Sequence, residues 1–202
     1  VAIFIYVGVE VGIPNFANLF MTSPEINIDP TIAGSVVGTY WFLMMIGRLC
    51  GASIGAKVSS RAMLTVVSTV GIVLVLGAIF CADNILVNMP VFKSDISFGF
   101  AQVPVNVMLL ILCGLCTSVM WGGIFNLAVE GLGKYTAAAS GLFMVMVCGG
   151  GILPLIQGGV ADFAGFLNSY WVIALGLAYI LFYAAIGSKN VNTDIPTDDY
   201  EA

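Results

Sequence analysis

Residues 103–129 read VPVNVMLLILCGLCTSVMWGGIFNLAV, an apolar stretch without a charged side chain. A helix needs about 20 apolar residues to cross the hydrocarbon core of a bilayer, whereas a transmembrane β-strand needs about ten residues of alternating polarity. The stretch is too long for one such strand, and its apolar residues do not alternate with polar ones. It therefore predicts a membrane-spanning helix.

Five further runs of the same kind lie at 1–21, 31–56, 62–82, 136–160 and 170–188. The composition agrees, because 60% of the residues are hydrophobic and 8% are charged, against about a quarter charged in soluble domains. We predict an all-α membrane protein, with a six-helix transmembrane bundle over residues 1–188. Residues 83–102, mixed in polarity and interrupted by Pro90, are expected to form a loop, and residues 189–202 a polar tail.

The positions of Lys and Arg predict the orientation, since basic residues are retained on the cytoplasmic side of a membrane. Six spans place both ends of the segment on one side, and five of the six basic residues lie there: Arg48, Lys57, Arg61, Lys134 and Lys189. Lys93 lies on the other side. Both ends are therefore expected in the cytoplasm and the 83–102 loop outside it. Because Val1 lies within an apolar run and no Met precedes it, we expect the segment to be part of a longer chain.

Several kinds of chemistry are excluded by what the sequence lacks. The chain has no histidine, which rules out His-dependent catalytic triads and the usual zinc hydrolase sites. It has no basic stripe that could hold nucleic-acid phosphates. Cys113 and Cys116 have the spacing of a redox motif but lie among leucines, and no pair of intramembrane carboxylates is available. We therefore expect no catalytic residue, no metal site and no cofactor.

The first span contains the most unusual polar residues. A charged carboxylate at mid-membrane depth is costly, so Glu10 is expected to face a cavity or to be protonated. Asn15 and Asn18 follow within two turns, and Pro14 is expected to break the helix between Glu10 and these amides. Two interpretations remain open, a structural pair between Glu10 and Arg48 and a substrate site formed by Glu10, Asn15 and Asn18.

The fourth span combines an aromatic ring and an amide with bare backbone. Trp121 and Asn126 flank Gly122 and Gly123. Sugar sites favour this combination, because an aromatic face packs against the C–H side of a pyranose while amides and carboxylates bind its hydroxyls. We therefore predict Trp121 and Asn126 as further substrate-binding residues.

Small residues recur at every fourth position in several spans. Such ridges allow helix backbones to approach closely, and close packing is the first interpretation for them. The ridges comprise Gly8 and Gly12, Gly34 and Gly38, and Gly47, Gly51 and Gly55. In the fifth span, Gly149, Gly150, Gly151 and Pro154 are expected to interrupt the helix and to serve as a hinge or a cavity wall.

Taken in order, several motifs resemble the C-terminal half of the fucose/hexose-proton symporter family of the major facilitator superfamily, especially its glucose/galactose branch. The motifs are Tyr6-Val7-Gly8-x-Glu10-Val11, Gly47-Arg48-x-x-Gly51, IFNLAVEGLGKYT at 124–136, Ser140-Gly141-Leu142, Gly149-Gly150-Gly151-Ile152, 154–158, Ala161-Asp162 and Gly165. The sequence departs from the family at Gly122-Gly123, where relatives often carry Pro-Thr, and in its longer 83–102 loop.

This resemblance implies that the six spans are helices seven to twelve of a twelve-helix carrier in a bacterial inner membrane. It further implies alternating-access transport of a monosaccharide, a hexose or deoxyhexose, with a proton as the coupling ion. An N-terminal six-helix half and the lipid bilayer would then be partners. Arg48, Lys57 and Arg61 resemble the cytoplasmic gating region of such a half. The alternative is a sugar sensor or regulatory protein that keeps the carrier fold without transport.

Overall fold

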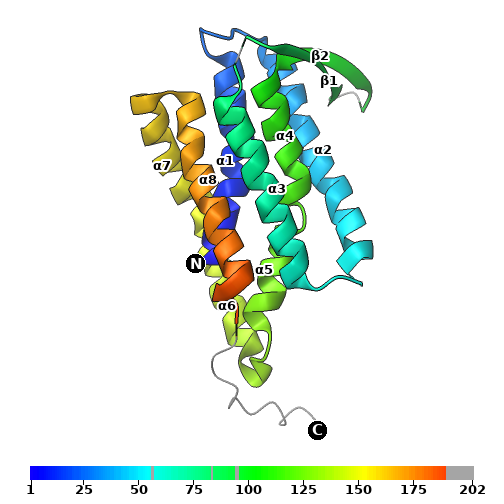
Figure 1. Ribbon diagram of the computed structural model, residues 1–202, viewed down its shortest axis with the longest axis vertical. Helices are drawn as coiled ribbons and strands as arrows, with labels where there is room; N and C mark the ends of the chain where they lie inside the picture. The colour runs from blue at the N-terminus through cyan, green and yellow to red at the C-terminus, as the bar shows by residue number, and fades with distance from the viewer. Residues whose placement is uncertain (56, 83, 94–95, 190–202) are drawn as a thin grey trace.

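The computed structural model describes residues 1–55, 57–82, 84–93 and 96–189 (Figure 1). Within these ranges, six helical segments are long and apolar enough to cross a membrane, and the all-α membrane fold is confirmed. The segments are Ala2–Thr22, Pro30–Gly55, Ser60–Phe80, Val105–Val129, Gly133–Ala164 and Phe166–Gly187. Their ends differ from the predicted ends by at most four residues. The predicted tail beyond residue 189 lies outside the described residues, as does the predicted end of the second span at residue 56.

Two of the six segments are divided. The undivided ones are α1 (Ala2–Thr22), α2 (Pro30–Gly55), α3 (Ser60–Phe80) and α8 (Phe166–Phe182), the last followed by a π-helical turn at Tyr183–Gly187. The fourth segment consists of α4 (Val105–Thr117) and α5 (Met120–Val129). The fifth consists of a 3-10 turn at Gly133–Tyr135, α6 (Thr136–Val145), a second 3-10 turn at Met146–Cys148, and α7 (Gly149–Ala164).

Pro14 does not break α1, so that prediction is wrong. The helix continues from Ala2 to Thr22 with Pro14 inside it. A proline within a membrane helix is tolerated where neighbouring helices satisfy the backbone group that it leaves without a partner.

Helices α2 and α3 begin with local capping groups at the ends of polar connections. Asp29 lies directly before α2, whose first residue is Pro30. Its carboxylate accepts a hydrogen bond of 2.8 Å from the Thr31 N–H in the first turn of the helix. This bond lowers the pKa of the Asp29 carboxyl. At α3, the Ser59 hydroxyl accepts from the Ala62 N–H at 3.3 Å. Each cap fixes the point at which a chain segment enters the bundle.

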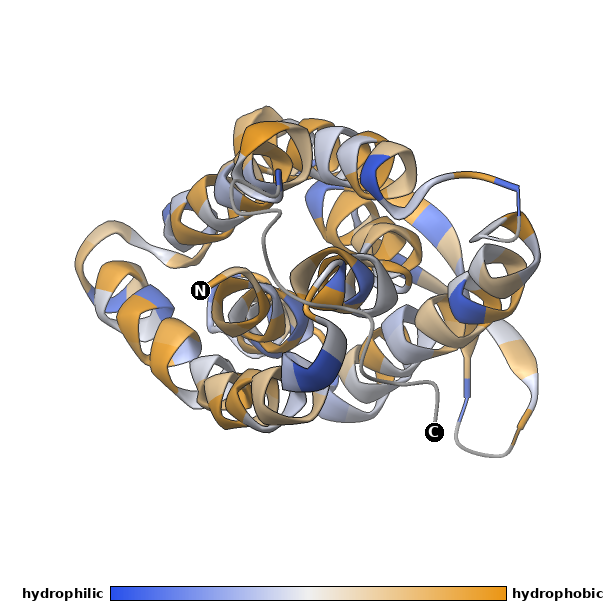
Figure 2. Ribbon diagram, turned by 90° about the horizontal axis from the view of Figure 1, so that it is seen from below, coloured by the Kyte–Doolittle hydropathy of each residue, from blue (hydrophilic) through white to orange (hydrophobic). Residues whose placement is uncertain are grey.

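Helix α1 lies at the centre of the bundle. It packs against α2, α4, α7 and α8, and Figure 2 shows its N-terminus enclosed by the other helices. Its inward side is fully buried, as at Tyr6, Val9 and Ile13. Helix α7 exposes most of its apolar side chains, including Leu155 and Phe163. Glu10 is therefore inside the bundle, whereas Asn15, on another side of α1, is exposed.

The expected loop at 83–102 instead contains a β-hairpin. Strand β1 (Leu86–Phe92) pairs antiparallel with β2 (Phe98–Pro104) over α2, at the top of Figure 1. Burial alternates along both strands, with Met89 and Val91 inside. Pro90 argued against regular structure, but proline is tolerated at sheet edges, and both strands of a hairpin are edges. The Phe92 N–H donates to the Thr39 hydroxyl at 2.8 Å, which attaches the hairpin to α2.

Candidate functional site

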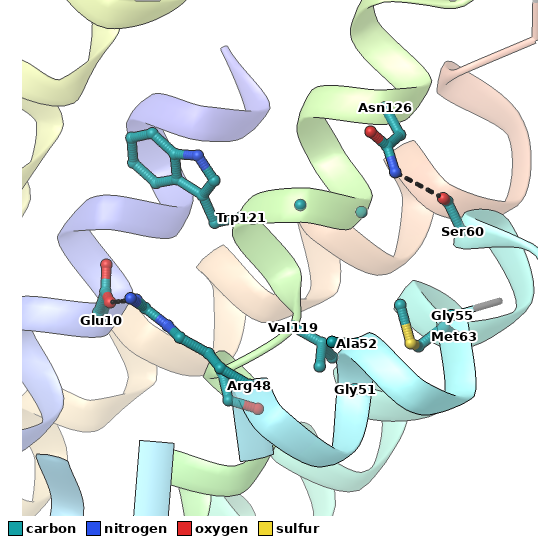
Figure 3. A pocket seen from close by; sticks show the side chains of 13 residues that line it. Glu10, Arg48, Gly51, Ala52, Gly55, Ser60, Met63, Val119, Trp121 and Asn126 are labelled. Carbon is teal, nitrogen blue, oxygen red and sulfur yellow. Dashed lines mark hydrogen bonds and ion pairs between the residues drawn. The ribbon is translucent and has the colours of Figure 1, made fainter. Parts of the chain in front are cut away.

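A cavity of about 630 Å³ opens between the central helix and the break in the fourth segment (Figure 3). Its size falls in the range of small-molecule sites, roughly 300–1,000 Å³. Its lining residues come from α1, α2, α3, α5 and the α4–α5 junction: Glu10, Arg48, Gly51, Ala52, Gly55, Ser60, Met63, Ser118, Val119, Trp121, Gly122, Gly123 and Asn126.

Three of the five predicted substrate-binding residues, Glu10, Trp121 and Asn126, line this cavity. Asn15 and Asn18 do not belong to its described lining, and the Asn15 side chain is exposed elsewhere on α1. The helix geometry gives the reason. Asn18 lies two turns beyond Glu10, about 12 Å along the axis, and Asn15 points to a different side of the helix. The structure therefore does not bring the two amides together with Glu10.

Glu10 and Arg48 form an ion pair at one end of the cavity. Arg48 Nη2 lies 3.2 Å from Glu10 Oε1, and the exposed fractions of the two side chains are 56% and 11%. The same nitrogen also lies 3.3 Å from the Met44 sulfur. This pairing is the structural alternative that the sequence left open. The pair still belongs to the cavity, because Glu10 and Arg48 both line it and the Arg48 side chain remains more than half exposed.

Trp121 stands beside the ion pair, while Asn126 lies at the opposite end of the cavity (Figure 3). The indole makes edge contacts with Tyr6, at 6.2 Å between ring centroids, and with Phe143, at 5.6 Å. These contacts hold a half-buried ring at the cavity wall. The Asn126 amide donates to the Ser60 hydroxyl at 3.3 Å, which ties α5 to the start of α3.

The three predicted gating residues occupy different positions. Arg48 lines the cavity, whereas Lys57 is exposed in the turn between α2 and α3. Arg61, in the first turn of α3, lines a second cavity of about 490 Å³ together with Asn126 and Glu130. Of the three, Arg48 alone contributes to the cavity that holds Glu10 and Trp121.

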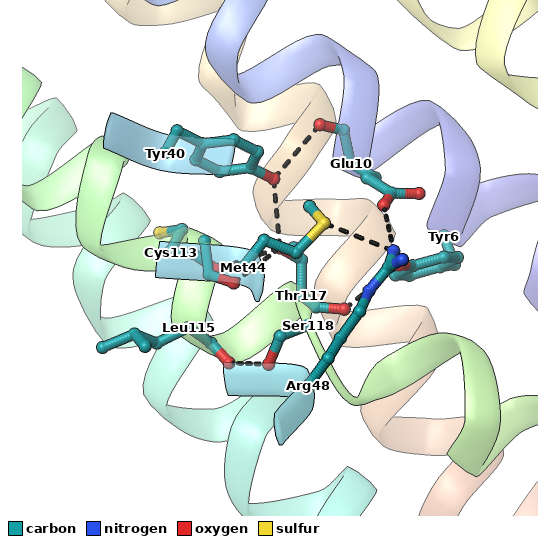
Figure 4. Close-up of polar contacts among 10 residues, drawn as sticks. Tyr6, Glu10, Tyr40, Met44, Arg48, Cys113, Leu115, Thr117 and Ser118 are labelled. Carbon is teal, nitrogen blue, oxygen red and sulfur yellow. Dashed lines mark hydrogen bonds and ion pairs between the residues drawn. The ribbon is translucent and has the colours of Figure 1, made fainter. Parts of the chain in front are cut away.

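The fourth segment changes course at Ser118 and Val119, next to the ion pair. Discontinuous helices leave backbone groups that must be satisfied within the protein, and carriers use such breaks to build substrate sites. Here the Tyr6 hydroxyl donates to the Thr117 carbonyl at 3.1 Å, and the Ser118 hydroxyl donates to the Leu115 carbonyl at 2.6 Å. Figure 4 shows both contacts together with the Glu10–Arg48 ion pair.

The glycine ridges mainly permit close packing. A side chain at Gly47 or Gly51 would collide with Ser118 or Val119, so α2 approaches the α4–α5 junction through these two positions. Gly8 and Gly149 allow α1 and α7 to approach each other in the same way. Gly34, by contrast, has no neighbour within 4 Å among the described residues.

The interruption expected at Gly149, Gly150, Gly151 and Pro154 is misplaced. All four lie within the regular helix α7, and the irregular turn precedes them at Met146–Cys148. Gly149 and Gly150 contact the backbone of Phe4 and the side chain of Val7 in α1, whereas Gly151 is open. Their hinge role remains a prediction.

The sequence did not identify Tyr6, Tyr40, Thr117 and Ser118, which join α1, α2 and the α4–α5 junction. The sequence did contain a signal for them, namely hydroxyl side chains within apolar spans and a proline, Pro14, inside α1.

All five cysteines are free, and Cys113 and Cys116 are buried in α4, where they pack as small apolar residues.

Known proteins resemble the chain over nearly its whole length. It is 30% identical over 191 residues to the glucose/galactose transporter of Brucella abortus biovar 1 (strain 9-941), covering 94% of this chain and 42% of the relative. It is 32% identical over 192 residues to the putative glucose/galactose transporter of Helicobacter pylori (strain 26695), covering 93% of this chain and 42% of the relative. The chain thus spans less than half the length of these relatives. No protein-family model matches it.

The fold also has a solved counterpart. The crystal structure of the major facilitator superfamily transporter FucP in the outward conformation superposes with a TM-score of 0.76. The sequence identity is 22%, and the match covers 94% of this chain and 41% of that one. The L-fucose-proton symporter of Escherichia coli is 33% identical over 92 residues, which are 45% of this chain and 21% of the relative.

Proposed function

Since the chain is homologous to the C-terminal part of glucose/galactose transporters and has the fold of a major facilitator superfamily carrier, we propose that it is one half of a monosaccharide carrier. The observation that carries this proposal is the cavity beside the broken fourth segment, where the Glu10–Arg48 pair and Trp121 meet. The other half would be the N-terminal six helices that correspond to the remaining length of the relatives.

The cavity supplies the groups that a hexose or deoxyhexose needs. Trp121 offers an aromatic wall for the apolar side of the ring, and Arg48 and Glu10 offer a donor and an acceptor for neighbouring hydroxyls. At the far end, Asn126 and Ser60 can exchange their mutual hydrogen bond for bonds to a sugar. Glu10 is then either a hydroxyl acceptor or an auxiliary site for the coupling proton.

Transport would follow from alternating access of this cavity between two bundles that rock around it. The two halves would enclose the cavity between them and open it first to one side of the membrane and then to the other. Arg48 is the residue through which closure and binding would be linked, because it pairs with Glu10 in the cavity and lies on the part of α2 that lines the cavity up to the helix end at Gly55.

Counterflow of labelled sugar in vesicles tests the proposal. The full carrier, reconstituted and loaded with unlabelled glucose, galactose or fucose, should transiently accumulate external labelled sugar of the same kind. Empty vesicles and vesicles loaded with mannitol are the controls. Sugar binding without counterflow for all three sugars would instead support a sensor that keeps the carrier fold.

The proposed orientation, with both ends of the segment in the cytoplasm, has its own test. Asn88 on β1 and Ser59 before α3 are both exposed and lie at opposite ends of the bundle. In a background in which the exposed Cys50 and Cys148 are replaced by Ser, Asn88→Cys should react with an impermeant thiol reagent in intact cells. Ser59→Cys should react only after permeabilisation, and the reverse pattern would invert the orientation.

A further inference from the structure

Pro14 leaves one backbone oxygen of α1 without its helical partner. In an α-helix the carbonyl of residue 10 accepts from the N–H of residue 14, and proline has no N–H. An unpaired carbonyl in an apolar interior is costly. The fully buried Tyr40 of α2 meets this need, because its hydroxyl lies 3.1 Å from the Glu10 carbonyl oxygen.

Counting hydroxyl protons gives the direction of the bonds around Tyr40. The Tyr40 and Thr117 hydroxyls lie 3.0 Å apart, and each has one proton to donate. Thr117 could donate to its own helix, at Cys113 O or Gly114 O. Both carbonyls already accept backbone hydrogen bonds. Cys113 O accepts from the Thr117 N–H in the regular α4 helix, and Gly114 O accepts from the Ser118 N–H at 3.2 Å. Tyr40 therefore donates to the Glu10 carbonyl, which has lost its helical donor, and the Thr117 proton is free to reach the Tyr40 oxygen.

Helix α2 therefore holds Glu10 from two sides. Tyr40, Met44 and Arg48 are four residues apart and share one face of the helix. Tyr40 binds the backbone of Glu10, while Arg48 binds its carboxylate at 3.2 Å and Met44 packs between them (Figure 4). The two contacts together set where the carboxylate stands in the cavity.

We propose that Tyr40 is a positioning residue of the sugar site, which replaces the N–H missing at Pro14 and so fixes Glu10 relative to Arg48 and to the α4–α5 junction. The functional part of this inference rests on the proposed function. The structural part does not, since it concerns a hydrogen bond that exists whether or not the protein transports sugar.

A double-mutant cycle between Tyr40→Phe and Pro14→Ala tests the structural part in the full carrier. Tyr40→Phe should lower the thermal unfolding midpoint in detergent by on the order of 5 °C, because the Glu10 carbonyl loses its partner. Pro14→Ala restores the helical N–H, so the double variant should regain at least half of this shift. Equal losses with and without Pro14→Ala would overturn the inference.

Tyr170→Phe is the matched control. Its hydroxyl is equally buried and donates to the Ile13 carbonyl at 2.8 Å. The helical donor for that carbonyl is the N–H of Ala17, which the chain retains. Tyr170→Phe should therefore show no rescue by Pro14→Ala. Rescue of both tyrosine variants to the same extent would mean that Pro14→Ala stabilises α1 in general, which would contradict the role assigned to Tyr40.

Sugar uptake tests the positioning role. Tyr40→Phe should raise the KM for sugar by on the order of fivefold, the value of one hydrogen bond, and Pro14→Ala should reverse most of this change. A purely structural role would lower the maximal rate through loss of folded carrier and leave KM unchanged. Rescue of the thermal midpoint in a protein that transports no sugar would refute the proposed function while leaving the hydrogen-bond assignment intact.

Discussion

Replacing Arg48 with Gln in the full carrier is expected to lower the rate of sugar uptake about tenfold. The change leaves the mostly buried Glu10 carboxylate without the cation that lies 3.2 Å away. Removal of one partner from a fully buried pair costs about 3–5 kcal/mol, but the Arg48 side chain is 56% exposed, so solvent compensates for much of the loss. Initial rates of labelled sugar uptake in vesicles measure the effect, with Lys93→Gln as a control that removes an equal charge outside the cavity.

Equilibrium binding of the sugar separates the two roles proposed for Arg48. A slower rate with unchanged Kd would support gating, and a weakened Kd would place the guanidinium in contact with the sugar. Glu10→Gln extends the test, because retained binding with loss of the pH dependence of uptake would indicate a proton role. Loss of binding at every pH would indicate a hydroxyl acceptor. Unchanged rate and Kd in both variants would remove the ion pair from the site.

The six spans could be predicted because one physical requirement, an apolar run as long as the bilayer is thick, determines them. The divisions within the spans could not. The break falls at Ser118 and Val119, which are neither proline nor glycine. The Tyr6 hydroxyl, which binds the Thr117 carbonyl there, comes from a distant part of the chain. The β-hairpin was missed for the opposite reason, since Pro90 marks irregular structure in sequence but is tolerated at the edge of a two-stranded sheet.

The cavity residues divide along similar lines. Glu10 and Trp121 could be selected from sequence because a carboxylate and an indole at mid-span are costly or unusual and need a local reason. Asn15 and Asn18 were selected by the same criterion and lie elsewhere on α1, because polarity does not reveal which side of a helix faces a cavity. Tyr40 was not selected, since its role depends on the position of a proline in another helix.

Two neighbouring glycines of α7 are expected to respond in opposite ways to the same substitution. A Cβ at Gly149 would overlap the Phe4 carbonyl in α1, whereas a Cβ at Gly151 would meet nothing within 4 Å among the described residues. Backbone cannot move aside as a side chain can, so Gly149→Ala should lower the thermal midpoint by on the order of 10 °C or abolish accumulation of the carrier. Gly151→Ala should match or slightly exceed the stability of the parent, because alanine favours a helix.

The same pair of variants distinguishes packing from a hinge. If α7 only packs closely against α1, Gly151→Ala should transport sugar at the parental rate, and the loss caused by Gly149→Ala should follow the amount of folded carrier. A Gly151→Ala carrier that is fully stable but slow would support the predicted hinge at Gly149, Gly150, Gly151 and Pro154. Parental stability of Gly149→Ala would contradict the close approach of α1 and α7, because the added methyl group has no space there unless the two helices lie farther apart.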